Sequence, residues 1–371
     1  MPDYQGNRRK EAFLYRRVTW PGQVETGEYR QFHGGSIEKS AFSTVRESGT
    51  VSFKGSDAPD DHDLLRIYYR FEDDFGRSAE HALSTMRMSC SEPKHMAGSV
   101  YGEVKLYGLL QVLSDKEYGR PFTVPAGTNA VSFARELCAG LGLVVNATAS
   151  SYKVSADHTF ADDESSYLEM VNWLLSAAGY SSAWTDAYGV VQMHPYIDPT
   201  EREASFTFED GDRSIMRPEI EFTNDLEDTP NVVRLFFEND EVSLWAVASN
   251  VDPSSRASLV SRRSEKTLKE NVTELAGVNA SEMLTNLKDM ALKKLLDNSS
   301  EIEYVKLDHP WIPLEPNDAV GVAHKASNIE WRGSITNMSV ELKPSIPVAM
   351  KARRYVHSSL VTEVEGGVLY G

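Results

Sequence analysis

Carboxylates are the side chains in this sequence that could most readily do chemistry. The 371 residues include 55 Asp and Glu, and a pair such as Asp162 and Asp186 has the residue types with which an enzyme cleaves a glycosidic bond. Both residues also have a structural explanation, because Asp162 precedes a predicted helix and Asp186 begins a turn of the form Asp-x-x-Gly. We favour the structural interpretation and keep a carbohydrate-active enzyme as the alternative.

Metal binding is the second chemistry to consider. The loop from Gly55 to Asp63 contains a cluster of acidic residues and one histidine, namely Asp57, Asp60, Asp61, His62 and Asp63. Clustered carboxylates bind hard cations, but this loop lacks the central glycine and terminal glutamate of a known calcium loop. No His-x-His or His-x-x-x-His spacing indicates zinc. A solvated turn is the favoured interpretation, and no bound metal is expected.

No cofactor or nucleophile motif occurs in the sequence. Gly140-Leu141-Gly142 follows a predicted helix, whereas a dinucleotide site binds phosphate at a helix N-terminus and has a third glycine. Gly-x-Ser-x-Gly and Gly-Lys-Ser/Thr are missing, and Cys90 and Cys138 are too few for a disulfide scaffold. The sequence therefore predicts no cofactor and no catalytic residue, and it favours a structural protein over an enzyme.

The charge of the chain narrows the classes of partner. A net charge of -17 argues against tight nucleic-acid binding, which depends on Lys and Arg displacing counterions. The N-terminal residues are basic, with Arg8, Arg9 and Lys10, whereas residues 201–241 hold 13 acids and 4 bases. No segment reaches the ~20 apolar residues of a membrane helix, and no signal peptide is recognisable, so we expect folding in the cytoplasm.

The elements that must position these residues follow from hydrophobic periodicity. Residues 16–121 and 217–355 alternate with period two, which is typical of strands, and residues 122–216 change to helical spacing. Predicted strands are 35–43, 49–53, 64–71, 84–89, 98–113, 143–146, 182–185, 190–193, 218–222, 231–237, 242–249, 301–307, 319–323 and 333–342. Predicted helices are one capped by Thr128 and ending near Gly140, one from the acidic residues 162–164 to Gly179, and one at 281–297. The fold class is α+β and mostly β: two β domains flank an α/β domain, between a basic arm at 1–15 and a tail at 356–371.

Six segments, in order from Tyr15 to Tyr355, resemble the baseplate-hub family of phage tails, which includes late-control hub proteins and the tail-associated hubs of siphophages. They are SIEKSAFSTVRESGTVSFKG, LLRIYYRFEDDFGRSAEHALSTMRMS, GEVKLYGLLQVLSD, DESSYLEMVNWLLSAAGYSSAWTDAYGVVQMHPY, TPNVVRLFFENDEVSLWAVASN and WIPLEPNDAVGV. In the last segment Asn317 stands where the family has glycine, a substitution that left-handed backbone tolerates.

The resemblance implies a homotrimer whose two β domains per subunit are tail-tube-like barrels or sandwiches, so that three chains match a six-fold tube. It implies a structural hub of the tail tip or baseplate in the virion, assembled in the bacterial host cytoplasm. Implied partners are a distal tail ring or tail tube protein, a tape measure protein and a three-fold central spike or fibre. DNA would pass through the channel without specific binding, which three chains of net charge -17 would favour.

Two groups of residues are candidates for these contacts. For the channel wall we nominate Glu209, Asp210, Asp212, Glu219 and Glu221, and for an acidic neighbour Arg8, Arg9 and Lys10. Residues 356–371 are expected to be flexible or to dock the spike. The alternative within the virion is another tail-tip component such as the hexameric distal tail ring.

Overall fold

A computed structural model describes residues 10–60, 62–73, 75–90, 92–160, 166–197, 202–211, 214–224, 229–239, 242–272, 275, 279–298, 301–345, 347–356 and 361–370. These residues form two compact units, each assembled from distant parts of the chain. Unit 1 comprises residues 1–220 and 306–352, and unit 2 comprises residues 221–305 and 353–371.

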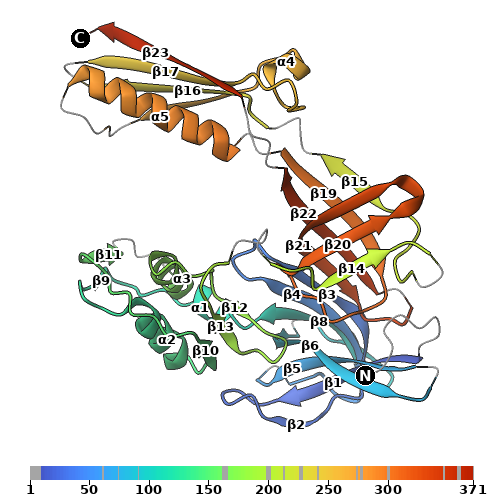
Figure 1. The fold of residues 1–371 in the computed structure, drawn as a ribbon. Coiled ribbons are helices and arrows are strands. Elements are labelled where there is room, and N and C mark those ends of the chain that lie inside the picture. The colour runs from blue at the N-terminus through green and yellow to red at the C-terminus, as the bar shows by residue number, and fades with distance from the viewer. Residues whose placement is uncertain are drawn as a thin grey trace. The chain divides into compact units, whose positions relative to one another are not determined.

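Unit 1 is built on one large sheet (Figure 1). Its early strands are β1 (Lys10–Val18), β2 (Glu25–Glu28), β3 (Phe32–Ser40), β4 (Glu47–Gly55), β5 (Leu64–Glu72), β6 (Ser78–Ser89), β7 (Lys94–Met96) and β8 (Ser99–Gly108). Its late strands are β14 (Phe206–Glu209), β20 (Ala319–His324), which leads into the 3-10 helix η2 (Lys325–Ser327), and β21 (Ile329–Glu341). The strands β19 (Glu301–His309) and β22 (Val348–Val356) are each divided between the units.

The antiparallel pair β3–β21 joins the two β-rich parts of the sequence. Its register runs from Ser40 opposite Asn337 to Ser36 opposite Glu341. In unit 1 the strand order is β19-β22-β21-β3-β4-β8-β6-β5-β1-β2, with β14 and β20 beside β21 and β7 beside β8. Strands from both predicted β domains therefore share one sheet in unit 1, whereas β16 (Val232–Glu238), β17 (Ser243–Asn250) and β18 (Thr267–Val272) of the second predicted domain belong to a separate sheet. The described pairings leave the large sheet open rather than closed as a barrel. Periodicity shows which face of a strand is buried, but it does not show which distant strand lies beside it.

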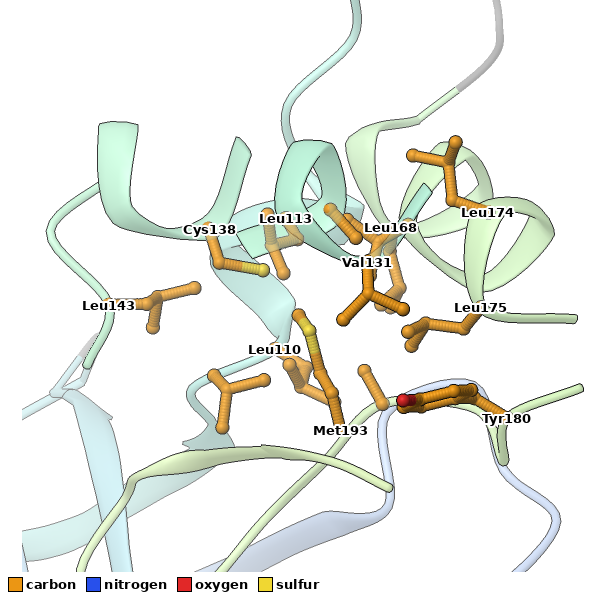
Figure 2. Packing of buried hydrophobic residues seen from close by; sticks show 14 of the residues in the cluster. Leu110, Leu113, Val131, Cys138, Leu143, Leu168, Leu174, Leu175, Tyr180 and Met193 are labelled. Atoms are coloured by element: carbon orange, nitrogen blue, oxygen red, sulfur yellow. The ribbon is translucent and has the colours of Figure 1, made fainter. Parts of the chain in front are cut away.

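The middle segment of the chain, from Gln111 to Met193, adds a small α/β layer to unit 1. Its helices are α1 (Gln111–Ser114), α2 (Ala130–Gly140) and α3 (Tyr167–Ala177), and its strands are β9 (Phe122–Val124), β10 (Val145–Ala147), β11 (His158–Phe160), β12 (Trp184–Thr185) and β13 (Val191–Met193). Figure 2 shows how side chains of α2 and α3 meet Leu110, Leu113 and Met193 in one apolar core. Cys138 points into this core, where burial raises the pKa of its thiol to about 12. It packs as a small apolar side chain, whereas Cys90 is only partly buried.

The N-caps of these two helices differ from the sequence prediction. Helix α2 is capped by Asn129, whose Oδ1 accepts a hydrogen bond from the N–H of Ser132 at 2.9 Å, and not by Thr128. The hydroxyl of Thr128 instead donates to the carbonyl of Pro125 at 2.7 Å. Helix α3 is capped by Ser166 in a capping box with Glu169, while the acidic residues 162–164 lie outside the described part of the chain.

Unit 2 is a four-stranded sheet covered on one face by a long helix (Figure 1). Its elements are β15 (Glu221–Asn224), β16 (Val232–Glu238), β17 (Ser243–Asn250), α4 (Leu259–Arg262), β18 (Thr267–Val272), α5 (Ala280–Asn298) and β23 (Thr362–Tyr370). The sheet order is β18-β16-β17-β23. Leu287, Ala291 and Leu295 of α5 pack on the apolar face of β16 and β17, as the spacing at 281–297 predicts.

The segment predicted as a C-terminal tail thus contains an edge strand of unit 2, paired with β17 from Thr362 to Tyr370. Most described residues outside the helices lie in strands, which confirms the mostly β, α+β fold class. None of the described helices is long and apolar enough to cross a membrane.

Candidate functional site

Asp186, one of the two carboxylates considered for catalysis, holds a turn. Its Oδ1 accepts hydrogen bonds from the N–H groups of Tyr188 at 2.9 Å and Val190 at 3.0 Å. Its Oδ2 accepts one from Nε2 of Gln192 at 2.9 Å. Asp162 lies outside the described residues, so no acid pair is seen. The geometry gives Asp186 the structural role of a turn acceptor.

Two carboxylates of the acidic loop before β5 form ion pairs with an arginine of β1. Arg17 of β1 forms ion pairs with Asp63 and, at 3.7 Å, with Asp60. The Nδ1 atom of His62 lies 2.8 Å from Asp60, and Asp61 is not described. Within the described ranges, no group of three or more His, Cys, Asp or Glu residues is arranged to hold a metal ion.

The predicted basic arm lies only partly in the described structure. Arg8 and Arg9 fall outside it. Lys10 begins β1, is exposed, and forms an ion pair with Glu72 at 3.0 Å. Residues 10–15 therefore belong to a strand paired along its length with β5, because the alternation of apolar and polar side chains in β1 continues that of the sheet.

The channel candidates are mostly exposed acids. Glu209 ends β14 in unit 1, Glu219 follows in the same unit, and Glu221 begins β15 in unit 2. Asp212 is not among the described residues. Asp210 accepts hydrogen bonds from the N–H groups of Lys325 and Ala326, each at 2.9 Å, and these bonds lower its pKa. Asp210 therefore caps η2 as well as lying at the surface.

A polar network in unit 1 ties the sheet to the Asp186–Gly189 turn. The guanidinium of Arg66 is buried and donates to Oγ1 of Thr85 at 2.8 Å, to Oε1 of Glu25 at 2.9 Å and to the carbonyl of Tyr188 at 3.0 Å. Thr85 donates in turn to the carbonyl of Ala187 at 2.9 Å.

A further side-chain hydrogen bond holds the same turn on the sheet. Nε2 of Gln23 donates to the carbonyl of Gly189 at 2.9 Å. Gly189 has a φ of +79°, and a Cβ added there would lie 2.7 Å from the side chain of Leu109. The positive φ favours glycine at this position, and an added side chain would require Leu109 to shift. The network therefore fixes the middle segment on the sheet by its main-chain carbonyls.

A buried charge cluster lies on the same sheet. Nζ of Lys39 lies 2.6 Å and 2.7 Å from the two carboxylate oxygens of Glu315 and 3.5 Å from Glu47. Ser84 donates to the far oxygen of Glu47 at 2.7 Å. Lys39 and Glu47 face each other across β3 and β4, so the cluster joins that hairpin to the loop before β20.

One cation shared by two carboxylates sets the protonation of the cluster. Burial raises the pKa of Glu47 to about 7; Lys39 opposes this shift and Glu315 adds to it. Burial by itself would lower the pKa of Lys39, but Glu315 and Glu47 outweigh it, so its pKa is raised. Lys39 therefore stays charged and bound to Glu315, and Glu47 is the group that takes up a proton near neutral pH.

A cleft of about 730 Å³ opens beside β7 and β8. Its walls carry three lysines, one histidine and two glutamates, namely Lys54, Lys94, Lys105, His33, Glu92 and Glu103. Phe53 and Tyr101 supply its apolar lining. The mixture of charges resembles ordinary polar surface and does not gather a catalytic set.

Sequence reasoning missed both networks, although it contained a partial signal for each. Lys39 has the strand parity of the apolar Ile37 and Ala41, which predicts an inward side chain. Arg66 lies in the segment LLRIYYRF, a strand that is buried on both faces. A charged residue is unusual in such a strand. Neither signal identifies a partner, because the partners are distant in sequence.

Comparisons with known proteins find solved structures of the same fold. No protein-family model and no curated protein matches the sequence. The tail protein from Neisseria meningitidis MC58 is similar with a TM-score of 0.60 at 13% identity, over 93% of this chain and 97% of that one. The 43 kDa tail protein of prophage MuSo2 from Shewanella oneidensis is similar with a TM-score of 0.60 at 10% identity, over 94% and 98%. A chain of the lidded Francisella PdpA-VgrG complex has a TM-score of 0.55 at 8% identity, over 96% of this chain and 56% of its own length.

These likenesses establish the fold. The two tail proteins share it over almost the full length of both chains, which a single common motif would not produce. The resemblance to phage tail proteins that the order of segments indicates is thereby confirmed at the level of fold.

Proposed function

We propose that this protein is the structural hub of a phage tail tip or baseplate, which closes the distal end of the tail tube. The observation that carries the proposal is the fold shared with the Neisseria tail protein over 93% of this chain and 97% of that one. The Shewanella tail protein supports it independently with the same TM-score of 0.60.

The proposed role is not catalytic. The described polar networks place their carboxylates in turns, caps and ion pairs, as Asp186, Asp210 and Glu315 show. An enzyme would instead need carboxylates directed toward a space that a substrate can occupy. If the protein were instead a carbohydrate-active enzyme, it would turn over purified cell wall, and the variant Asp186→Asn would lose this activity.

The active assembly in this proposal is a homotrimer that matches a six-fold tube to a three-fold spike or fibre. Its other partners are a distal tail ring or tube protein and a tape measure protein, and DNA crosses its channel without specific binding. Exposed acids such as Glu209, Glu219 and Glu221 are proposed for the channel wall, because carboxylates repel the phosphate backbone. Asp210 is the weakest member of the set, since both its oxygens already accept hydrogen bonds.

The test is the mass and shape of the purified full-length chain. Native mass spectrometry and light scattering should give three copies, and negative-stain images should show a ring with a central opening. A hexamer would favour the distal tail ring instead. A particle that stays monomeric across the accessible concentration range and has no opening would refute the hub.

A further inference from the structure

The sheet of unit 2 ends on both sides in strands whose outer edges have no described neighbour. Strand β18 lies outside β16, and β23 lies outside β17. An edge strand presents unpaired N–H and C=O groups and is a template for pairing with another chain. Both edges are therefore available, within the described residues, for an added strand.

Side chains on the two edges carry opposite charges in one transverse row. The face opposite α5 contains Glu365 on β23, which lies across from Val247 on β17. Val247 lies across from Arg234 on β16, and Arg234 across from Lys269 on β18. Glu365 and Lys269 are both exposed. The row thus runs from a carboxylate at one edge of the sheet to an ammonium at the other.

The directions of the strands allow the sheet to continue into a second copy. Strand β23 is antiparallel to β17, β17 is antiparallel to β16, and β16 is parallel to β18. The two edge strands therefore run in the same direction. A rotated copy can place its β18 parallel to β23, and such a head-to-tail contact closes into a ring when the rotation closes.

Exposed apolar side chains on the edge strand β23 favour a contact that would bury them. Leu369 is 64% exposed and Val368 is 48% exposed at the C-terminal end of β23. An edge strand that combines length with exposed apolar side chains is unusual in a protein that remains monomeric.

We propose that the copies of this chain contact one another through unit 2, with β18 of one copy paired to β23 of the next. In this contact Lys269 of the neighbouring copy lies beside Glu365 and continues the transverse row. The inference rests on the proposed homotrimer and names a contact that holds it together. A second copy is the partner indicated, because the two edges that must be complementary belong to the same chain.

Charge reversal tests the contact in the full-length protein. Lys269→Glu and Glu365→Lys should each raise the concentration for half-assembly at least about tenfold, since each puts like charges side by side. The double variant carries both changes in one chain and restores an opposite pair, so it should return to within about threefold of wild type. Lys293→Glu is the matched control, because Lys293 is an exposed lysine that belongs to α5 and to neither edge strand.

The possible outcomes separate this inference from the proposed function. Analytical ultracentrifugation gives the assembly constants, and circular dichroism shows that each variant is folded. If the single variants assemble like wild type, or the double variant does not recover, the edge contact is wrong while the trimer stands. If wild type is monomeric throughout, the trimer itself fails and the contact with it.

Discussion

Arg66 of β5 donates a hydrogen bond from Nη2 to the main-chain carbonyl of Tyr188, and the two atoms are 3.0 Å apart although the residues are 122 positions apart in sequence. The guanidinium also lies 5.1 Å from the centre of the Tyr188 ring. A planar donor of this kind can bond Glu25 and Thr85 at the same time. Arg66 therefore connects strand β5 of the sheet to the Asp186–Gly189 turn.

Replacing Arg66 with Ala should loosen that turn. The change removes three side-chain hydrogen bonds and takes this donor from Thr85 and from the carbonyl of Tyr188, while Glu25 keeps Arg16 and Tyr68. We expect a cost of about 3 kcal/mol in the free energy of unfolding. Urea denaturation measures the loss, and hydrogen exchange should rise at residues 186–190. Arg70→Ala, an exposed position on the same strand, should change stability by less than about 0.5 kcal/mol. Unchanged exchange at 186–190 in the Arg66 variant would contradict the docking role.

The elements of the fold could be predicted from the sequence more completely than their partners. The helix expected at 281–297 is α5 at Ala280–Asn298, because its apolar spacing spans several turns. The turn at Asp186–Gly189 was predicted from its residue types. Strand β23 was missed because Gly366 and Gly367 weaken a strand pattern. The structure gives a reason for Gly366, since a Cβ there would lie 2.7 Å from the carbonyl oxygen of Trp245.

The buried polar networks form only when particular strands pair, and hydrophobic periodicity does not predict which strands pair. Lys39 and Glu47 come together because β3 and β4 pair in one register, and Glu315 joins them from 276 residues beyond Lys39. The same limit explains why the β3–β21 pairing, and with it the single sheet of unit 1, was not foreseen.

The N-cap of α2 can be tested against the sequence prediction. Asn129→Ala should destabilise the protein by about 1 kcal/mol, because the N–H of Ser132 loses its acceptor and the carbonyl of Ser150 loses its donor. Thr128→Ala should cost clearly less, since that hydroxyl only donates to Pro125. Thermal denaturation of both variants makes the comparison. An equal or larger effect at Thr128 would indicate that Thr128, as predicted from sequence, is the N-cap of α2.

Glu47 should make stability depend on pH. Its pKa is about 7 in the folded protein against 4.5 in its ordinary state, so the folded state holds a proton that the unfolded chain releases. The stability that this proton provides is complete below pH 4.5 and is lost as pH rises through about 7. Glu47→Gln keeps an acceptor for Ser84 and cannot ionise. The difference in unfolding free energy between wild type and this variant should therefore fall from about pH 5 and level off above about pH 7 in urea titrations, and a constant difference would show that Glu47 does not titrate in this range.

Gly35 should tolerate no side chain. It has a φ of +118° at an irregularity in the β3–β4 pairing, and an added Cβ would lie 2.0 Å from the carbonyl oxygen of Thr50. Because that oxygen belongs to the main chain of the neighbouring strand, Gly35→Ala must either separate β3 from β4 or distort the hairpin that holds Lys39 and Glu47. We expect a loss above about 3 kcal/mol, or failure to fold. Gly34→Ala is the matched control: its φ is +59° and nothing lies within 4 Å of the added Cβ, so only the left-handed backbone cost of about 1 kcal/mol should appear. Chemical denaturation and soluble yield of the two variants measure the difference, and similar stabilities would show that Gly35 does not lie close to the carbonyl of Thr50.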